Sequence, residues 1–101
     1  MKNKIVLITG ATSGIGWATA LTLAKAGAQL ILCGRRTEKL KALAKEIGGT
    51  TQLLTFDVRD KDAVFKAIAS LPDPWKSIDL LVNNAGNAHG LDPVQTASLE
   101  D

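Results

Sequence analysis

A short apolar segment that breaks into a glycine-rich turn constrains the fold of this 101-residue chain more than any other feature. Residues Ile5 to Ile8 are too few to cross a membrane and short for a buried helix, so they predict a strand covered on both faces. Gly10, Gly14 and Gly16 follow, and glycines permit positive φ and close approach of a ligand to the backbone. Free amides at the start of the next helix attract anions. The segment therefore predicts a phosphate-binding turn that suits a nucleotide pyrophosphate.

The bulk properties predict one soluble domain or part of one, since 46% of the residues are hydrophobic and the net charge is +2. A signal peptide and a long apolar stretch are both missing from the sequence, which predicts a cytoplasmic protein without a membrane partner. Basic residues alternate with acidic ones over 39–45 and 59–66, which argues against a nucleic-acid partner. Cys33 is expected to be a small buried hydrophobe, and His89 lacks partners at metal-ligand spacing, so we predict no metal site.

The apolar spacing predicts strands and helices that alternate along the whole chain. Ser13, Thr37 and Asp60 are the predicted N-caps, and Gly27 and Gly48 are expected to end the first two helices. This alternation predicts a doubly wound α/β fold with a parallel sheet in the strand order 3-2-1-4. The expected elements are a strand at 5–8, a helix at 15–26, a strand at 29–33, a helix through 40–47, a strand at 52–56, a helix through 64–71 and a strand at 78–82.

The glycine spacing Gly-x3-Gly-x-Gly is neither G-x-G-x-x-G nor a Walker A loop, because no Gly-Lys-Ser/Thr follows. The string Thr9 to Gly16, together with Asn83-Asn-Ala-Gly86 after the last predicted strand, resembles the short-chain dehydrogenase/reductase family. The resemblance covers the whole chain and implies a single dinucleotide-binding (Rossmann) domain over residues 1–101, with the first four strands only. An ordinary polar turn would also explain residues 83–86. The residues that the resemblance assigns to the cofactor in these two loops are Gly10, Ala11, Thr12, Ser13, Gly14, Ile15, Gly16, Asn83, Asn84, Ala85 and Gly86.

The end of the second predicted strand reads Cys33-Gly-Arg35-Arg36. Proteins that bind NAD place an acidic residue there to hold the ribose 2′-hydroxyl, and that acid is missing here. Two guanidinium groups would attract a 2′-phosphate, which favours NADP over NAD as the cofactor. The alternative is that Arg35 and Arg36 belong to a solvated loop.

Asp57 and Val58 end the third predicted strand at the same edge of the sheet. The resemblance assigns Asp57 to the adenine amino group and Val58 to a backbone contact with the ring. An aspartate in this place could instead cap the turn before the next helix, so both interpretations stay open.

The segments Leu71 to Trp75 and Asn87 to Pro93 resemble the NADP-dependent serine or 3-hydroxy acid dehydrogenase branch of the family. This implies that the parent is a homo-oligomeric oxidoreductase that interconverts a hydroxyl and a carbonyl on a small polar substrate. The family's catalytic residues are a serine, a tyrosine and lysine in Tyr-x3-Lys, and an asparagine. Since the chain contains no tyrosine, we assign no catalytic residue and expect no turnover by residues 1–101 alone.

Ser98 to Asp101 matches the start of a helix, which predicts a chain that ends as that helix begins, like an amino-terminal fragment. The edge of the last predicted strand would then be unpaired and sticky. Two other functions stay open, namely a non-catalytic NADP-binding or redox-sensing module and a structural half-domain that binds nothing until it is complemented.

Overall fold

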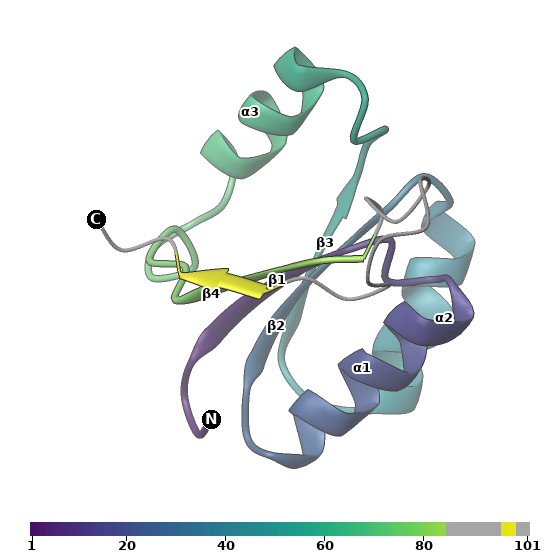
Figure 1. The fold of residues 1–101 in the computed structure, drawn as a ribbon, viewed down its shortest axis with the longest axis vertical. Coiled ribbons are helices and arrows are strands. Elements are labelled where there is room, and N and C mark those ends of the chain that lie inside the picture. Colours follow the sequence, from purple (N-terminus) through teal and green to yellow (C-terminus); the bar gives the residue numbers. More distant parts are fainter. Residues whose placement is uncertain (85–95, 99–101) are drawn as a thin grey trace.

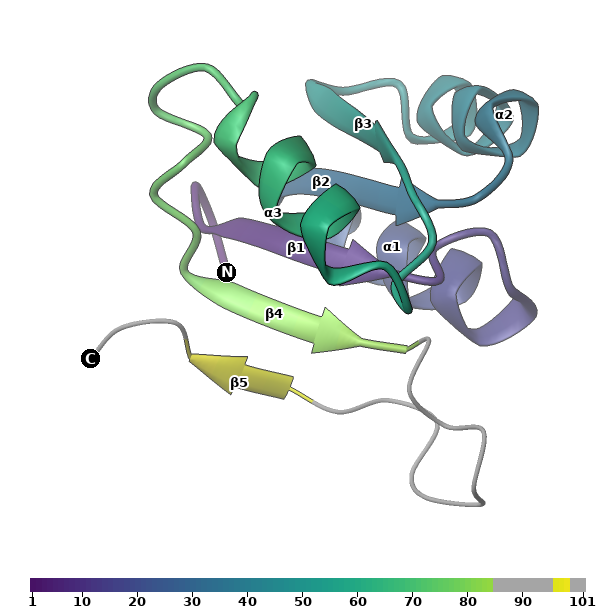
Figure 2. The same cartoon turned by 90° about the horizontal axis from the view of Figure 1, so that it is seen from above.

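A computed structural model describes residues 1–84 and the backbone of residues 96–98. One sheet runs through it in the order β3-β2-β1-β4-β5, and the first four of these strands are parallel, which confirms the predicted doubly wound α/β fold and its 3-2-1-4 order (Figure 2). The elements are β1 (Ile5–Thr9), α1 (Gly14–Lys25), β2 (Gln29–Gly34), α2 (Thr37–Ile47), β3 (Thr51–Thr55), α3 (Lys61–Ala69), β4 (Leu80–Asn83) and β5 (Thr96–Ser98).

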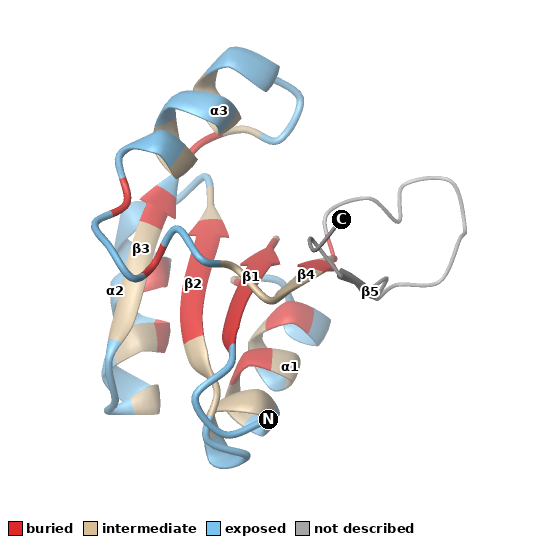
Figure 3. Ribbon diagram, turned by 90° about the vertical axis from the view of Figure 1, so that its left-hand side faces the viewer, coloured by how far each residue is buried: buried red, intermediate tan, exposed pale blue. Residues whose placement is uncertain are grey.

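The helices cover both faces of the sheet, with α1 and α2 on one side and α3 on the other (Figures 1 and 2). Alternate residues of a strand point to opposite faces, so a strand between two helical layers must be apolar throughout. In β1, Val6 and Ile8 pack on the α1–α2 side, whereas Ile5 and Leu7 pack on the α3 side. Figure 3 shows the result, with β1 buried along its whole length and β2 buried between its two end residues. The apolar run in the sequence therefore reflects two cores that share one sheet.

Two of the three predicted helix caps are confirmed. The Ser13 hydroxyl accepts a hydrogen bond from the Gly16 amide at 3.2 Å, and the Asp60 carboxylate accepts one from the Ala63 amide at 3.1 Å. The prediction for Thr37 is wrong, because α2 begins at Thr37 and Arg36 occupies the cap position without a side-chain hydrogen bond.

The last described strand differs from the prediction. Ser98 was expected to begin a helix, but Thr96–Ser98 forms β5, which pairs antiparallel with β4. The physical reason is that the outer edge of β4 offers unpaired amides and carbonyls, which an extended segment satisfies. The expected open edge at β4 is therefore covered along Leu80–Val82, while residues 99–101 lie outside the described part.

Cys33 lies in the α3-side core, as the sequence predicts. Burial raises the pKa of its thiol to about 12, so the sulfur stays protonated and unreactive at neutral pH. Among the described residues, no helix has the length and apolar character that crossing a bilayer would require.

Candidate cofactor-binding site

A groove of about 940 Å³ lies at the carboxyl ends of the parallel strands. In an open parallel sheet this edge is where ligands bind, because the loops after the strands meet there. The described residues that line the groove come from the end of β2, from the loops after β1, β2, β3 and β4, and from the first turns of α1 and α2. They are Gly10, Thr12, Ser13, Gly14, Ile15, Gly34, Arg35, Arg36, Lys39, Phe56, Asp57, Val58, Arg59 and Asn84.

The three glycines of the first loop serve different purposes. Gly10 has a φ of 61°, which glycine permits, whereas Gly14 and Gly16 do not take positive φ. A Cβ on Gly16 would lie 2.7 Å from the Asn84 Nδ2 atom and closer still to the Gly10 carbonyl oxygen. In the part of the chain that the structure describes, a Cβ on Gly14 would meet no atom within 4 Å. Gly16 thus allows the helix to approach the turn closely, whereas Gly14 leaves open space at the groove.

Ser13 holds the turn together. Its hydroxyl donates to the Gly10 carbonyl at 2.9 Å and accepts from the Gly16 amide and from Asn84 Nδ2, the latter at 2.6 Å. The structure gives the amides of Gly14 and Ile15 no acceptor among the described residues. These amides and the positive end of α1 therefore face the groove as donors for an anion.

Two asparagines mark the end of β4, Asn83 as its last residue and Asn84 directly after it. Asn83 Oδ1 accepts a hydrogen bond from the Thr9 hydroxyl at 3.0 Å, which ties β4 to β1. Asn84, which is only 4% exposed, donates from Nδ2 to the Gly10 carbonyl at 3.1 Å as well as to Ser13. This pair therefore fixes the glycine turn to the centre of the sheet.

A cationic wall borders the groove after β2. Arg35 and Arg36 line it, and Lys39 joins them one turn into α2. Because Arg36 provides no side-chain cap, the first amides of α2 also remain available at this wall. Lys39, Lys41 and Lys45 are all exposed on α2, and of these three only Lys39 lines the groove.

Asp57 lines the groove from the loop after β3 and forms an ion pair with Arg59 at 2.8 Å. Asp57 Oδ1 also accepts from the Arg59 backbone amide at 2.9 Å, which is a turn-capping contact of the kind left open by the sequence. The Arg59 hydrogen bonds lower the pKa of Asp57 from 3.8 to about 2. The stabilisation from this pair is therefore complete above about pH 4 and is lost as the pH falls towards 2.

The structure brings most of the sequence-predicted residues to this one groove. Ala11 and Gly16 lie buried behind the turn, Asn83 contacts Thr9, and Ala85 and Gly86 lie outside the described residues. Sequence reasoning missed the groove residues Gly34, Lys39, Phe56 and Arg59. An Asx-turn pattern at Asp57-x-Arg59 was the available signal for Arg59. Within the described ranges, no group of His, Cys, Asp and Glu side chains could hold a metal ion.

Comparison with known proteins agrees with this geometry. The model of the short chain dehydrogenase family matches residues 4–101. The chain therefore belongs to the short-chain dehydrogenase family, and its fold is the Rossmann-like fold of that family.

Among its relatives, serine 3-dehydrogenase of Agrobacterium fabrum is 51% identical over 96 residues, which are 95% of this chain and 39% of that protein. NADP-dependent 3-hydroxy acid dehydrogenase YdfG of Salmonella typhi is 47% identical over 97 residues, or 96% of this chain and 39% of that protein. A closed form of serine dehydrogenase complexed with NADP+ superposes with a TM-score of 0.72 at 40% identity, over 76% of this chain and 31% of that one. The chain thus spans about two fifths of the length of these two curated relatives.

Proposed function

We propose that the groove binds the adenosine 2′-phosphate and the pyrophosphate of NADP(H). The intact gene product would then be an NADP-dependent oxidoreductase that interconverts a hydroxyl and a carbonyl on serine or another 3-hydroxy acid. One observation carries the proposal. The same groove is lined by the start of α1 at Gly14, which suits an anion, and by the cationic side chains of Arg35 and Arg36. The named activities of the relatives supply the substrate class.

The residues present fit the cofactor. The amides of Gly14 and Ile15 and the open space over Gly14 suit a pyrophosphate, which needs donors and close backbone approach. Arg35, Arg36 and the uncapped first turn of α2 suit a 2′-phosphate, since a guanidinium can donate two parallel hydrogen bonds to it. When bound, NADP+ would accept the hydride and NADPH would supply it, and the role of this chain would be to hold and orient the cofactor.

The groove also has walls for the adenine. Phe56 and Val58 line it beside Asp57, and Val58 is 39% exposed. An apolar surface with a carboxylate at its rim suits a flat ring that carries an amino donor. Asp57 would accept a hydrogen bond from that amino group, and Asn83 to Gly86 would border the ribose.

Activity of the intact gene product tests the proposal. With serine or a 3-hydroxy acid as substrate, we expect reduction of NADP+ with a kcat/KM at least about tenfold above that for NAD+, since one charge-assisted hydrogen bond is worth about 1.5–3 kcal/mol. Equal use of both cofactors, or turnover with neither, would contradict it. The 101-residue chain alone serves as the control and is expected to bind the cofactor without turnover.

A non-catalytic NADP-binding or redox-sensing module is the second candidate. The observation that favours it is that the groove residues the structure describes are suited to holding a nucleotide, and none of them is assigned to proton transfer. Tight NADP binding by the intact gene product, without turnover of any 3-hydroxy acid, would support this candidate.

Replacing Lys39 with alanine is expected to weaken binding of 2′,5′-ADP about threefold to tenfold, or about 0.7–1.4 kcal/mol, and to leave 5′-AMP binding unchanged. The reason is that Lys39 lies at the same wall as Arg35 and Arg36. Calorimetric titration of the variant measures the effect. Lys41→Ala is the matched control, because Lys41 is an exposed lysine of the same helix that does not line the groove. Equal losses in the two variants would contradict a site-specific role.

A further inference from the structure

Asp57 is an anion in a groove whose other charged residues are cations. Arg35, Arg36 and Lys39 form the wall after β2, and Asp57 faces them from the loop after β3. The charge of Arg35 contributes to lowering the pKa of Asp57, so the two side chains interact electrostatically. An unneutralised Asp57 would attract Arg35 and repel a phosphate bound beside it. The carboxylate therefore needs a counter-ion if Arg35 is to serve a phosphate.

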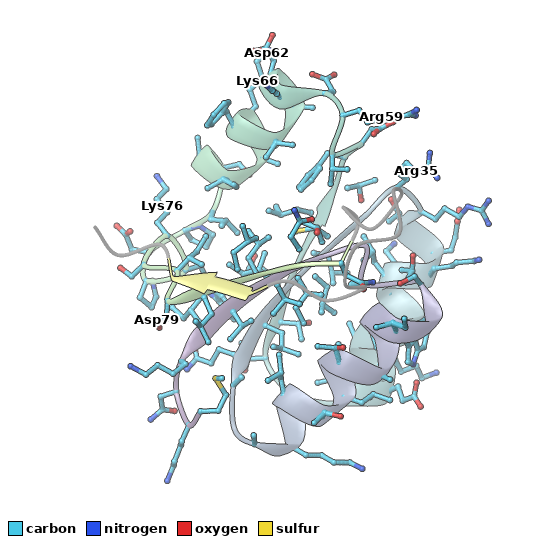
Figure 4. The ribbon with its side chains drawn as sticks, in the orientation of Figure 1. Arg35, Arg59, Asp62, Lys66, Lys76 and Asp79 are labelled. Atoms are coloured by element: carbon cyan, nitrogen blue, oxygen red, sulfur yellow. The ribbon has the colours of Figure 1, made fainter. Side chains whose placement is uncertain are left out.

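Arg59 occupies both oxygens of that carboxylate. Its Nε atom lies 3.1 Å from Oδ1 and 3.2 Å from Oδ2, and a terminal nitrogen lies 2.8 Å from Oδ2. This is the fork geometry in which a guanidinium pairs most strongly with a carboxylate. Within the described part of the chain, Arg35 takes part in no ion pair, and Figure 4 shows Arg35 and Arg59 at the same end of the molecule. The pairing of Arg59 with Asp57 thus leaves Arg35 free.

We propose that Arg59 is a specificity-determining residue that acts through Asp57: by occupying the carboxylate, it keeps Arg35 available for the 2′-phosphate of the nucleotide. The inference rests on the proposed function, and it adds a residue to which neither the family resemblance nor the loop sequence assigned a role. Arg59 is a positioning residue in this scheme, since it contacts Asp57 and not the phosphate.

The turn itself does not depend on the Arg59 side chain. The contact that caps the turn comes from the Arg59 backbone amide, which any residue at this position supplies. The Arg59 side chain is 79% exposed, so its removal eliminates few packing contacts and should change stability little. A substitution at position 59 therefore separates the electrostatic role from a structural one.

The ratio of the dissociation constants for 5′-AMP and 2′,5′-ADP is the quantity to measure, by calorimetric titration at low ionic strength. Both ligands carry the same adenine, so changes at the adenine contact cancel in the ratio and only the 2′-phosphate contribution remains. We expect Arg59→Ala to lower this ratio about threefold, because solvent screens an interaction between exposed charges. Lys66→Ala, which removes the same charge from an exposed position on α3 (Figure 4), is expected to leave the ratio unchanged.

A second substitution makes the result specific to Asp57. Asp57→Asn removes the competing charge and keeps an acceptor oxygen, so Asp57→Asn together with Arg59→Ala should restore the ratio to at least its original value. Two results would overturn the inference while the proposed function stands. One is a ratio that is unchanged in Arg59→Ala, and the other is a ratio that is as low in the double variant as in Arg59→Ala alone. A ratio near one in the unsubstituted chain would instead overturn both.

Discussion

Replacing Gly16 with alanine is expected to remove stability and nucleotide binding together. The added Cβ would lie 2.7 Å from Asn84 Nδ2 and even closer to the Gly10 carbonyl, and both atoms belong to the network that shapes the turn. Overpacking of this kind costs about 1–3 kcal/mol, so we expect the free energy of unfolding to fall by about that amount. Displacement of the turn would weaken 2′,5′-ADP binding at least about tenfold, because each factor of ten needs only about 1.4 kcal/mol. Denaturant unfolding and calorimetric titration measure the two effects.

Gly14→Ala is the matched control, because it adds the same methyl group two residues away in the same loop. The new Cβ would meet no atom of the described residues within 4 Å, and Gly14 does not take positive φ, so stability should be unchanged or higher by about 0.4–1 kcal/mol. Binding should still weaken, because the methyl group would occupy the space proposed for the pyrophosphate. A Gly14→Ala variant that binds as well as the original chain would show that the phosphates do not lie over this turn.

The second large effect is expected at Arg35. Arg35→Ala should weaken binding of 2′,5′-ADP about tenfold to a hundredfold, since a hydrogen bond to a charged group contributes about 1.5–3 kcal/mol. Binding of 5′-AMP should change little, because that ligand lacks the 2′-phosphate. Parallel titrations of the variant with the two nucleotides provide the measurement.

Arg35→Lys tests whether geometry contributes as well as charge. Lysine keeps the positive charge and lacks the planar fork, so we expect a loss intermediate between the original chain and Arg35→Ala. If Arg35→Ala weakened both nucleotides equally, the side chain would serve the fold or the overall charge and not the 2′-phosphate.

The fold was predictable because its determinants are local. The apolar run Ile5 to Ile8 indicates a strand buried on both faces, and Ser13 and Asp60 are capping residues whose bonding partners lie three residues ahead. The side chain of Thr37 does not cap α2, and this could not be predicted in the same way. Its hydroxyl lies 3.0 Å from the Thr55 hydroxyl at the end of β3, and that contact exists only once the sheet has formed. The open edge of β4 was predicted, but the pairing of Thr96–Ser98 with it was not, because that pairing depends on a contact between two segments and not on a local pattern.

The sequence predicted the groove residues that lie in the loops after the strands, but it did not predict Lys39 and Arg59. Gly10 and Arg35 follow directly after β1 and β2, and Asp57 comes two residues after the end of β3, so a parallel sheet necessarily brings all three to one edge. Lys39 and Arg59 reach the groove from α2 and from the turn after β3, and their participation depends on how those segments are oriented. Their charges are ordinary surface charges in the sequence, which gives no sign of the groove between them.

Titration of the unsubstituted chain with 2′,5′-ADP and with 5′-AMP, in the same low-salt buffer, tests the central claim most directly. The account predicts that 2′,5′-ADP binds at least about tenfold more tightly than 5′-AMP. It also predicts that the two dissociation constants become more similar as added salt screens the charges of Arg35 and Arg36. Equal dissociation constants for the two nucleotides would show that Arg35 and Arg36 do not recognise a 2′-phosphate, and would contradict the account.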